Sequence, residues 1–264
     1  MLLHPNGFCA GLYEPIAAAL TSTARPIAID LLGHGASSAP TDPDAYAFER
    51  LAEDVLAVLD VFSPRGVAGV GGSLGGAVAI LVDRLDPGRW SRLLLAEPVA
   101  FERLSDGRPG ANPMADAVAE EVDRDRPGGA GKGGRTFASR EALRAAYAAR
   151  EPLARLAPEA LAAYAEWGVV RDAQGVRLAC DPEVEATIFE SAAGLSGAAA
   201  AWDHLARLSC PATIVTGRET FLPDVFAAQA ARARAELVTL PGGHFVLHED
   251  TARGVDLIRR YALS

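Results

Sequence analysis

The feature that most constrains this chain is a serine enclosed by glycines, in the run GGSLGG at residues 71–76. An apolar run, Val67–Val70, precedes it, and an apolar helical pattern, Ala77–Leu85, follows it. A serine on a sharp strand-to-helix turn has a strained backbone, so the residues two before and two after it must be small. Gly71 and Gly75 meet that requirement. The motif is therefore typical of a nucleophile elbow, which places a serine at a helix N-terminus, where backbone N–H groups favour negative charge.

Composition excludes several classes of protein. The 264 residues are 50% hydrophobic, enough for one large domain or for one domain with an insertion. The net charge of −9 is spread along the chain, so we expect no nucleic-acid partner. No apolar run reaches about 18 residues and no signal-peptide pattern is present, so we expect a cytoplasmic protein without a membrane span. Cys9, Cys180 and Cys210 lie far apart and indicate no disulfide framework.

Short apolar runs alternate with longer helical patterns. The expected strands are Met1–His4, Pro26–Asp30, Gly66–Gly71, Arg92–Ala96, Ala212–Thr216 and Leu237–Leu240. The expected helices include Leu12–Leu20, Phe48–Phe62, Leu74–Leu85, Pro223–Ala233 and Thr251–Tyr261. This alternation predicts an α/β fold, with a mostly parallel sheet and helices on both faces. In such sheets the functional groups gather at the carboxyl ends of the strands.

One segment, from about Phe101 to Leu208, breaks the alternation. It is Ala-rich, mostly helical in pattern, and contains a glycine-rich loop at Pro127–Gly134. We therefore predict a core made of residues 1–100 and 209–264, and a helical cap, or lid, made of residues 101–208.

A serine nucleophile needs a general base, and five histidines compete for that role. His244 follows two glycines in the loop after the last strand, which lets the loop fold back over the sheet edge, and it is the expected base. His248 is expected at a helix start and His204 in the cap. Structural roles are expected for His34, in a turn, and for His4, at a strand end.

The acid that would orient the base has three candidates. Glu97 follows a strand directly and is the favoured acid, because a carboxylate just past a strand end is well placed to accept from a histidine ring. Glu219 is the alternative acid and Asp224 the third choice; both follow the next strand.

An oxyanion hole needs backbone N–H donors, and two loops can supply them. Leu74, the residue after the nucleophile, is one expected donor. The second should come from the loop after the first strand. Pro5 has no N–H, so the donor is Asn6, Gly7 or Phe8.

Motifs for bound cofactors are missing from the sequence. It has no G-x-G-x-x-G after the first strand, no phosphate-binding loop that ends in Lys-Ser or Lys-Thr, and no H-E-x-x-H. We therefore expect neither a cofactor nor a metal.

The order Ser73, Glu97, His244, together with HPNGF at residues 4–8 and DLLGHG at residues 30–35, resembles the α/β-hydrolase superfamily. The resemblance extends over nearly the whole chain and implies a serine hydrolase with a helical cap. Members of this superfamily normally have two further strands before the one expected at Met1–His4, so the resemblance implies a sheet that lacks them.

The resemblance also bears on individual site residues. Most members carry the acid at the position of Thr220, and the haloalkane dehalogenase branch includes members with a carboxylate at the position of Glu97. That branch often has an asparagine at the position of Asn6, the expected second oxyanion residue. Dehalogenases and epoxide hydrolases use an aspartate nucleophile, so Ser73 argues against both activities.

The expected function is cleavage of a carboxylic ester or related acyl bond in a small molecule. The alternatives are a thioesterase, lactonase, C–C hydrolase or cofactor-free lyase on the same triad, or a ligand-binding protein without catalysis. Phe8, Arg135 and Arg140 are candidate substrate contacts, because guanidinium groups beside a glycine-rich loop are suited to hold an anion. The alternative is that both arginines are solvated, or that they pair with Glu141, Glu151 or other cap acids. The sequence leaves the oligomeric state open.

Overall fold

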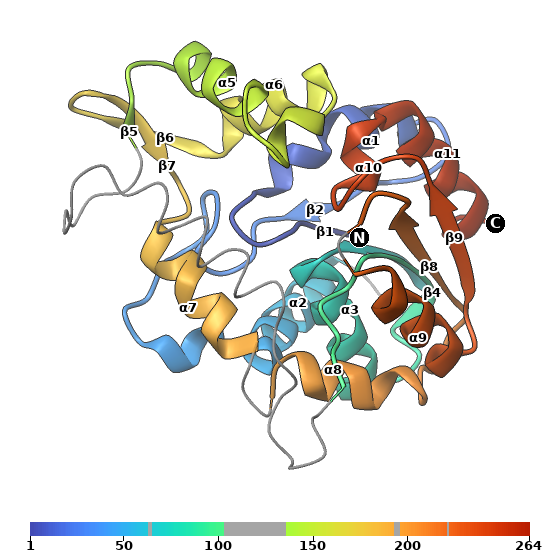
Figure 1. Ribbon diagram of the computed structural model, residues 1–264. Coiled ribbons are helices and arrows are strands. Elements are labelled where there is room, and N and C mark those ends of the chain that lie inside the picture. The colour runs from blue at the N-terminus through green and yellow to red at the C-terminus, as the bar shows by residue number, and fades with distance from the viewer. Residues whose placement is uncertain (63–64, 103–135, 193–195, 221) are drawn as a thin grey trace.

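A parallel six-stranded sheet forms the centre of the computed structural model, which describes residues 1–62, 65–102, 136–192, 196–220 and 222–264. The strand order is β2-β1-β3-β4-β8-β9 (Figure 1). The strands are β1 (Leu2–Leu3), β2 (Ala28–Ile29), β3 (Val67–Gly72), β4 (Trp90–Ala96), β8 (Ala212–Gly217) and β9 (Glu236–Leu240). Each overlaps an expected strand, with bounds that differ by one or two residues, and every pairing in this sheet is parallel, which confirms the predicted fold class.

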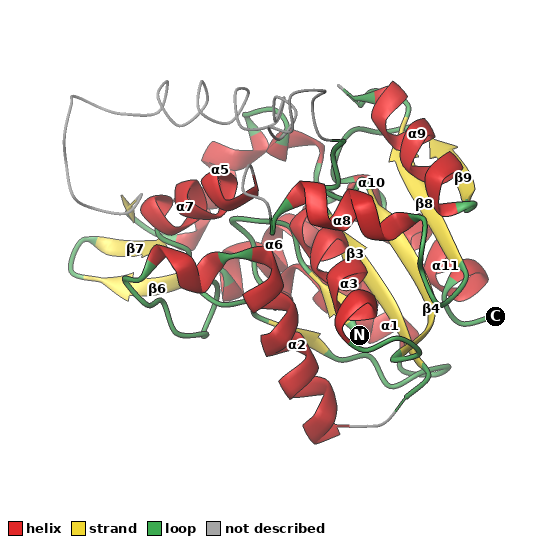
Figure 2. Cartoon of the chain, turned by 90° about the horizontal axis from the view of Figure 1, so that it is seen from below, coloured by secondary structure: helices red, strands yellow, loops and turns green. Residues whose placement is uncertain are grey.

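Helices cover both faces of the sheet, as Figure 2 shows. The main helices are α1 (Glu14–Leu20), α2 (Phe48–Phe62), α3 (Leu74–Leu85), α8 (Ala198–Leu205), α9 (Pro223–Ala233), α10 (Val246–Glu249) and α11 (Thr251–Tyr261), with short 3-10 helices η1 (Ala10–Tyr13) and η2 (Pro43–Tyr46). In the buried core, α2, α3 and α8 pack on one face, and α1, α10 and α11 on the other. Four of the five expected helices have the bounds that the sequence predicts, and η1 with α1 takes the place of the fifth.

The strands show why the sequence folds this way. In β4, Leu93 and Leu95 belong to the core beneath α2 and α3, whereas Leu94 and Ala96 belong to the core beneath α1 and α11. Successive side chains of a strand point to opposite faces, so a continuous apolar run supplies both cores. All four residues are buried, which fixes the register of the strand.

The region between β4 and β8 contains a feature that the helical pattern does not predict. Its described elements are β5 (Thr136–Phe137), α5 (Arg140–Ala148), η3 (Leu153–Arg155), α6 (Pro158–Trp167), β6 (Val169–Asp172), β7 (Gly175–Leu178) and α7 (Pro182–Ala192). The three strands form a small antiparallel sheet in the order β5-β7-β6. Gly175, with a φ of +139°, lies at the hairpin between β6 and β7, a turn signal that the sequence does carry.

Two parts of this region pack differently. Residues of α5, α6 and β7 form a separate apolar cluster with Phe8 and Leu12, and they lie to one side of the large sheet in Figure 1. Helix α8 instead packs on α3 in the main core. The cap boundaries at residues 101 and 208 stay a prediction, and α8 joins the core from inside that range. Within the described ranges, no helix is long and apolar enough to cross a membrane.

Candidate active site

Ser73 occupies the tight turn between β3 and α3. Its φ of +52° and ψ of −115° are strained values for a residue with a side chain. Neighbouring backbone leaves no room for larger residues, since a Cβ on Gly75 would lie 2.2 Å from the carbonyl oxygen of Leu3. A Cβ on Gly71 would lie 2.4 Å from the carbonyl oxygen of Gly75. The turn therefore has no room for a side chain at either of these two glycine positions.

Glu97 lies directly after β4 and is fully buried. Its φ of +46° marks a second strained turn, next to the elbow. The carboxylate accepts hydrogen bonds from the Thr216 hydroxyl (2.7 Å), the Gly217 N–H (2.9 Å) and the Thr220 hydroxyl (3.0 Å). These donors hold the carboxylate in one orientation, and their supporting role is a feature that the sequence reasoning missed.

His244 lies in the loop after β9 and contacts Glu97. Its Nδ1 is 2.7 Å from Oε2 of Glu97, so Nδ1–H donates to the carboxylate and Nε2 is the ring nitrogen on the far side. Glu249 holds this loop, because its carboxylate accepts from the N–H groups of Gly243 (2.8 Å) and Phe245 (3.1 Å). Both neighbours of His244 are therefore fixed by one side chain, which the sequence reasoning did not identify.

The other acid candidates point elsewhere. Glu219 forms an ion pair with Arg155 of η3 at 2.6 Å, and 56% of its side chain is exposed. Asp224 is exposed in the first turn of α9. Thr220, at the position where the resemblance places the acid, instead donates to Glu97. Of the three candidates, Glu97 is the one bonded to His244.

The backbone N–H groups of the loop after β1 differ in their hydrogen bonds to the described residues. The N–H of Gly7 lies 3.1 Å from both the Asn6 Oδ1 and the His34 Nε2, and the N–H of Phe8 donates to the Pro5 carbonyl at 3.3 Å. Neither the N–H of Asn6 nor that of Leu74 donates to an acceptor among the residues that the structure describes. These are the two groups that the sequence nominates for an oxyanion hole.

The remaining histidines are buried and lie in other settings. His4 and His34 hydrogen-bond to loop backbone, as their expected structural roles require. His204, on α8, contacts Asp83 of α3 at 2.8 Å. His248 lies in α10, near a helix start as predicted, and its two ring nitrogens have no hydrogen-bond partner within the described part of the chain. Burial lowers the pKa of His248 to about 3, so its ring is neutral.

The expected substrate contacts have distinct surroundings. Phe8 is buried, and the centroid of its ring lies 4.9 Å from that of Tyr164 and 5.0 Å from that of Phe245. The ring of Phe245 in turn contacts that of His244. Arg140 forms an ion pair with Glu166 of α6 at 3.3 Å, which matches the alternative of pairing with a cap acid, although with a different acid from those named. Arg135 lies outside the described residues. The substrate contacts of all three stay predictions.

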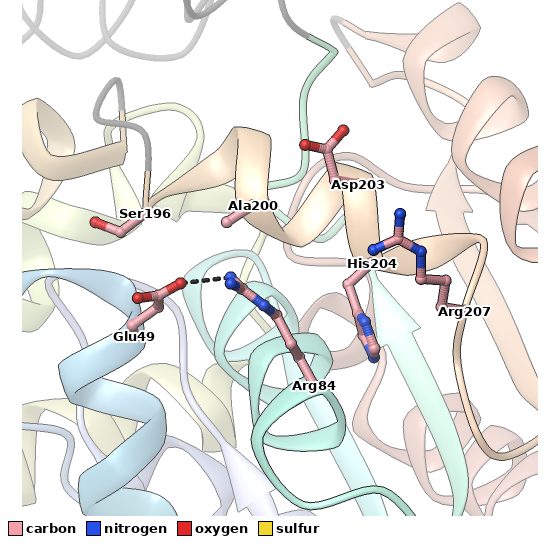
Figure 3. Close-up of a pocket in the computed structure, with 7 residues that line it drawn as sticks. All are labelled: Glu49, Arg84, Ser196, Ala200, Asp203, His204 and Arg207. Atoms are coloured by element: carbon pink, nitrogen blue, oxygen red, sulfur yellow. Dashed lines mark hydrogen bonds and ion pairs between the residues drawn. The ribbon is translucent and has the colours of Figure 1, made fainter.

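A cavity of about 390 Å³ lies between α2, α3 and α8 (Figure 3). It is lined by Glu49, Arg84, Ser196, Ala200, Asp203, His204 and Arg207. None of these is a predicted site residue, and Figure 3 shows the ion pair between Arg84 and Glu49. Over the described ranges, no cluster of three or more His, Cys, Asp or Glu side chains is arranged to hold a metal ion.

Comparison with known proteins places the chain in a family. A family model described as "Alpha/beta hydrolase family" matches residues 1–257. The chain belongs to the alpha/beta hydrolase family. This confirms the superfamily resemblance. No curated protein matches the sequence at a significant level.

Solved structures share the alpha/beta hydrolase fold with this chain. An E-2-(acetamidomethylene)succinate hydrolase matches with a TM-score of 0.80 at 19% identity, over 100% of this chain and 90% of the other. A thioesterase domain from the curacin biosynthetic pathway matches with a TM-score of 0.73 at 20% identity, over 98% and 89%. An esterase of M. tuberculosis matches with a TM-score of 0.72 at 23% identity, over 98% and 83%. At these identities the likeness concerns the fold.

Proposed function

We propose that this alpha/beta hydrolase is a serine hydrolase that cleaves carboxylic esters or related acyl bonds through an acyl-enzyme. The observation that carries the proposal is the hydrogen bond of 2.7 Å between His244 Nδ1 and the buried Glu97, in a fold that places Ser73 on a strained elbow after the neighbouring strand. A nucleophile, a base and an orienting acid are the parts that acyl transfer needs.

In the proposed reaction, the Ser73 hydroxyl oxygen attacks the acyl carbonyl carbon while His244 Nε2 takes the hydroxyl proton. Glu97 keeps the Nδ1–H tautomer and stabilises the imidazolium that forms. The N–H groups of Leu74 and Asn6 stabilise the oxyanion. As the tetrahedral intermediate collapses, the leaving group departs with the proton from His244, and an ester of Ser73 remains. Water, activated by His244, then releases the acid and restores Ser73.

Thioester hydrolysis is the second candidate function. It uses the same groups, because a thiolate leaves from the same tetrahedral intermediate as an alkoxide. The similar structures include both an esterase and a thioesterase domain, which supports testing both acyl bonds together.

The test is turnover of acyl 4-nitrophenyl esters and matched acyl thioesters of increasing chain length. We expect wild-type turnover of at least one series, and a loss of about 10⁶-fold in kcat for Ser73→Ala, since the nucleophile is removed. Ser196→Ala is the matched control, because Ser196 lines the cavity between α3 and α8 and should keep full activity. Circular dichroism checks that both variants are folded.

Substantial turnover by a folded Ser73→Ala variant would contradict the mechanism. An inactive wild type that binds acyl compounds without cleaving them would favour the binding-protein alternative.

A further inference from the structure

Two buried histidines connect the Asn6 loop to the loop after β2. His4 lies at the start of one loop and His34 within the other, and both side chains are fully buried. Their rings pack edge to face, with centroids 4.8 Å apart. Neither histidine has a place in the proposed proton transfers, so their burial calls for another explanation.

The hydrogen bonds of each ring define its tautomer. His4 Nδ1 lies 2.8 Å from the Pro5 carbonyl oxygen, which can only accept, so Nδ1 carries the proton and Nε2 accepts from the Leu31 N–H at 3.0 Å. His34 has a similar arrangement, with Nδ1–H donating to the Leu32 carbonyl at 3.0 Å. Its Nε2 lies 3.1 Å from both the Gly7 N–H and the Asn6 Oδ1, and because a backbone N–H can only donate, we assign Nε2 as the acceptor from Gly7. Each ring therefore donates a hydrogen bond through Nδ1 and accepts one from a backbone N–H through Nε2.

Burial keeps both rings neutral. It lowers the pKa of His4 to about 4 and that of His34 to about 3. A neutral Nδ1–H tautomer always presents an unprotonated Nε2, so both rings act as fixed acceptors near neutral pH. A protonated Nε2 would instead face the N–H groups of Leu31 and Gly7.

The Asn6 N–H belongs to the peptide whose carbonyl is that of Pro5, and these contacts hold the backbone on both sides of it. His34 and the Asn6 side chain both bind the Gly7 N–H, while the Pro5 carbonyl on the other side of Asn6 is held by His4. We propose that His4 and His34 are positioning residues that orient the Asn6 N–H toward the oxyanion. This inference rests on the proposed serine hydrolase function and extends it.

The test compares asparagine and glutamine at His34. Glutamine places an acceptor oxygen near the position of Nε2, whereas asparagine places its amide near Nδ1 and leaves the Gly7 N–H without the ring acceptor. The readout is the rate at which a 4-nitrophenyl ethyl phosphonate diester modifies Ser73, followed by release of 4-nitrophenol. The phosphoryl oxygen of this probe occupies the oxyanion position.

We expect His34→Asn to react about 10- to 100-fold more slowly, a partial loss of the 10²- to 10³-fold effect of one oxyanion donor. His34→Gln should recover most of the wild-type rate. For the ester substrate, His34→Asn should lower kcat with little change in KM. His204→Asn is the control, because this buried histidine contacts Asp83 and not the Asn6 loop. The melting temperature of this variant should fall, while its rate of reaction with the probe should equal the wild-type rate.

The same pair of variants is made at His4, where glutamine retains the acceptor for Leu31, so a variant that fails to fold at one position leaves the other. A wild-type reaction rate in a folded asparagine variant would overturn the inference. Equal losses in the asparagine and glutamine variants, in step with their melting temperatures, would also overturn it, because they indicate a merely structural role. A wild type that the probe leaves unmodified would instead overturn the serine chemistry, and the inference with it.

Discussion

The described part of the chain contains two buried histidine–carboxylate pairs that are almost identical in chemistry. His244 lies 2.7 Å from Glu97, with side chains 8% and 0% exposed. His204 lies 2.8 Å from Asp83, with side chains 9% and 0% exposed. Each carboxylate also accepts from a hydroxyl and a backbone N–H: Glu97 from Thr216 and Gly217, and Asp83 from Ser209, which supplies both donors.

The difference between the pairs lies in geometry and location. His244 uses Nδ1 toward its carboxylate, which leaves the outer nitrogen, Nε2, on the side away from the acid. His204 uses Nε2, so Nδ1, the ring nitrogen nearer to its own backbone, is the one that does not contact the carboxylate. Glu97 follows a strand at a strained turn beside the elbow, whereas Asp83 lies within α3 and joins that helix to α8. Burial and distance alone therefore do not distinguish the proposed catalytic pair from the other pair. The ring nitrogen that contacts the carboxylate, and the position beside the Ser73 elbow, do distinguish it.

Among changes to the two pairs, the largest effect should follow from Glu97→Gln. A glutamine can favour the wrong tautomer of His244, so kcat should fall by up to about 10⁴-fold. The control is Glu219→Gln, the exposed acid paired with Arg155, which should retain nearly full activity. Steady-state kinetics on the best ester decide the comparison. If Glu219→Gln proves the more damaging change, the proposed acid is wrong.

A smaller effect, on stability alone, should follow from Asp83→Asn. It weakens hydrogen bonds to a buried charged group from His204 and Ser209, so the free energy of unfolding should fall by about 2–3 kcal/mol. The kcat at a temperature well below melting should stay at the wild-type value. Urea unfolding and ester turnover on one preparation test both statements. A loss of kcat in the folded variant would break the distinction between the two pairs.

The smallest effect concerns His248, a buried histidine with no carboxylate partner among the residues that the structure describes. Its pKa is lowered by burial to about 3, from 6.5, so between these values the unfolded chain binds a proton that the folded chain does not. The free energy of unfolding therefore falls as the pH drops below 6.5, by about 1.4 kcal/mol per unit for this one site.

His248→Leu removes that site. As the pH is lowered from 7.5 to 5, the free energy of unfolding of the variant should rise by about 2 kcal/mol relative to that of wild type. Urea unfolding of both proteins at the two pH values measures this change. If the free energies of unfolding of the variant and the wild type differ by the same amount at both pH values, His248 takes up its proton in the folded chain as readily as in the unfolded chain. That result would also make burial a poor guide to the state of the other histidines.

Much of the fold could be predicted because local pattern determines it. The apolar runs of β3 and β4, the helix bounds of α2 and α3 and the glycines of the elbow each report on their own surroundings. The small β5-β7-β6 sheet was missed, since strands of two to four residues next to Ala-rich helices leave a weak alternation.

The site depends more on contacts between distant residues. The sequence placed Glu97 and Glu219 as alternatives at strand ends, but the contacts that separate them come from Thr216 and Thr220 on one side and Arg155 on the other. The His204–Asp83 pair joins residues 121 positions apart, and no local pattern predicts it. Such pairings depend on how the helices pack, which a single sequence does not encode locally.

The most direct test of the central claim is to identify the residue that a fluorophosphonate modifies in the intact protein. Mass spectrometry of peptides from the treated wild type should locate one phosphonyl group on Ser73, and Glu97→Gln should slow its formation while Asp83→Asn leaves the rate unchanged. Modification of a different residue, or no modification of a folded wild type, would contradict the proposed serine chemistry.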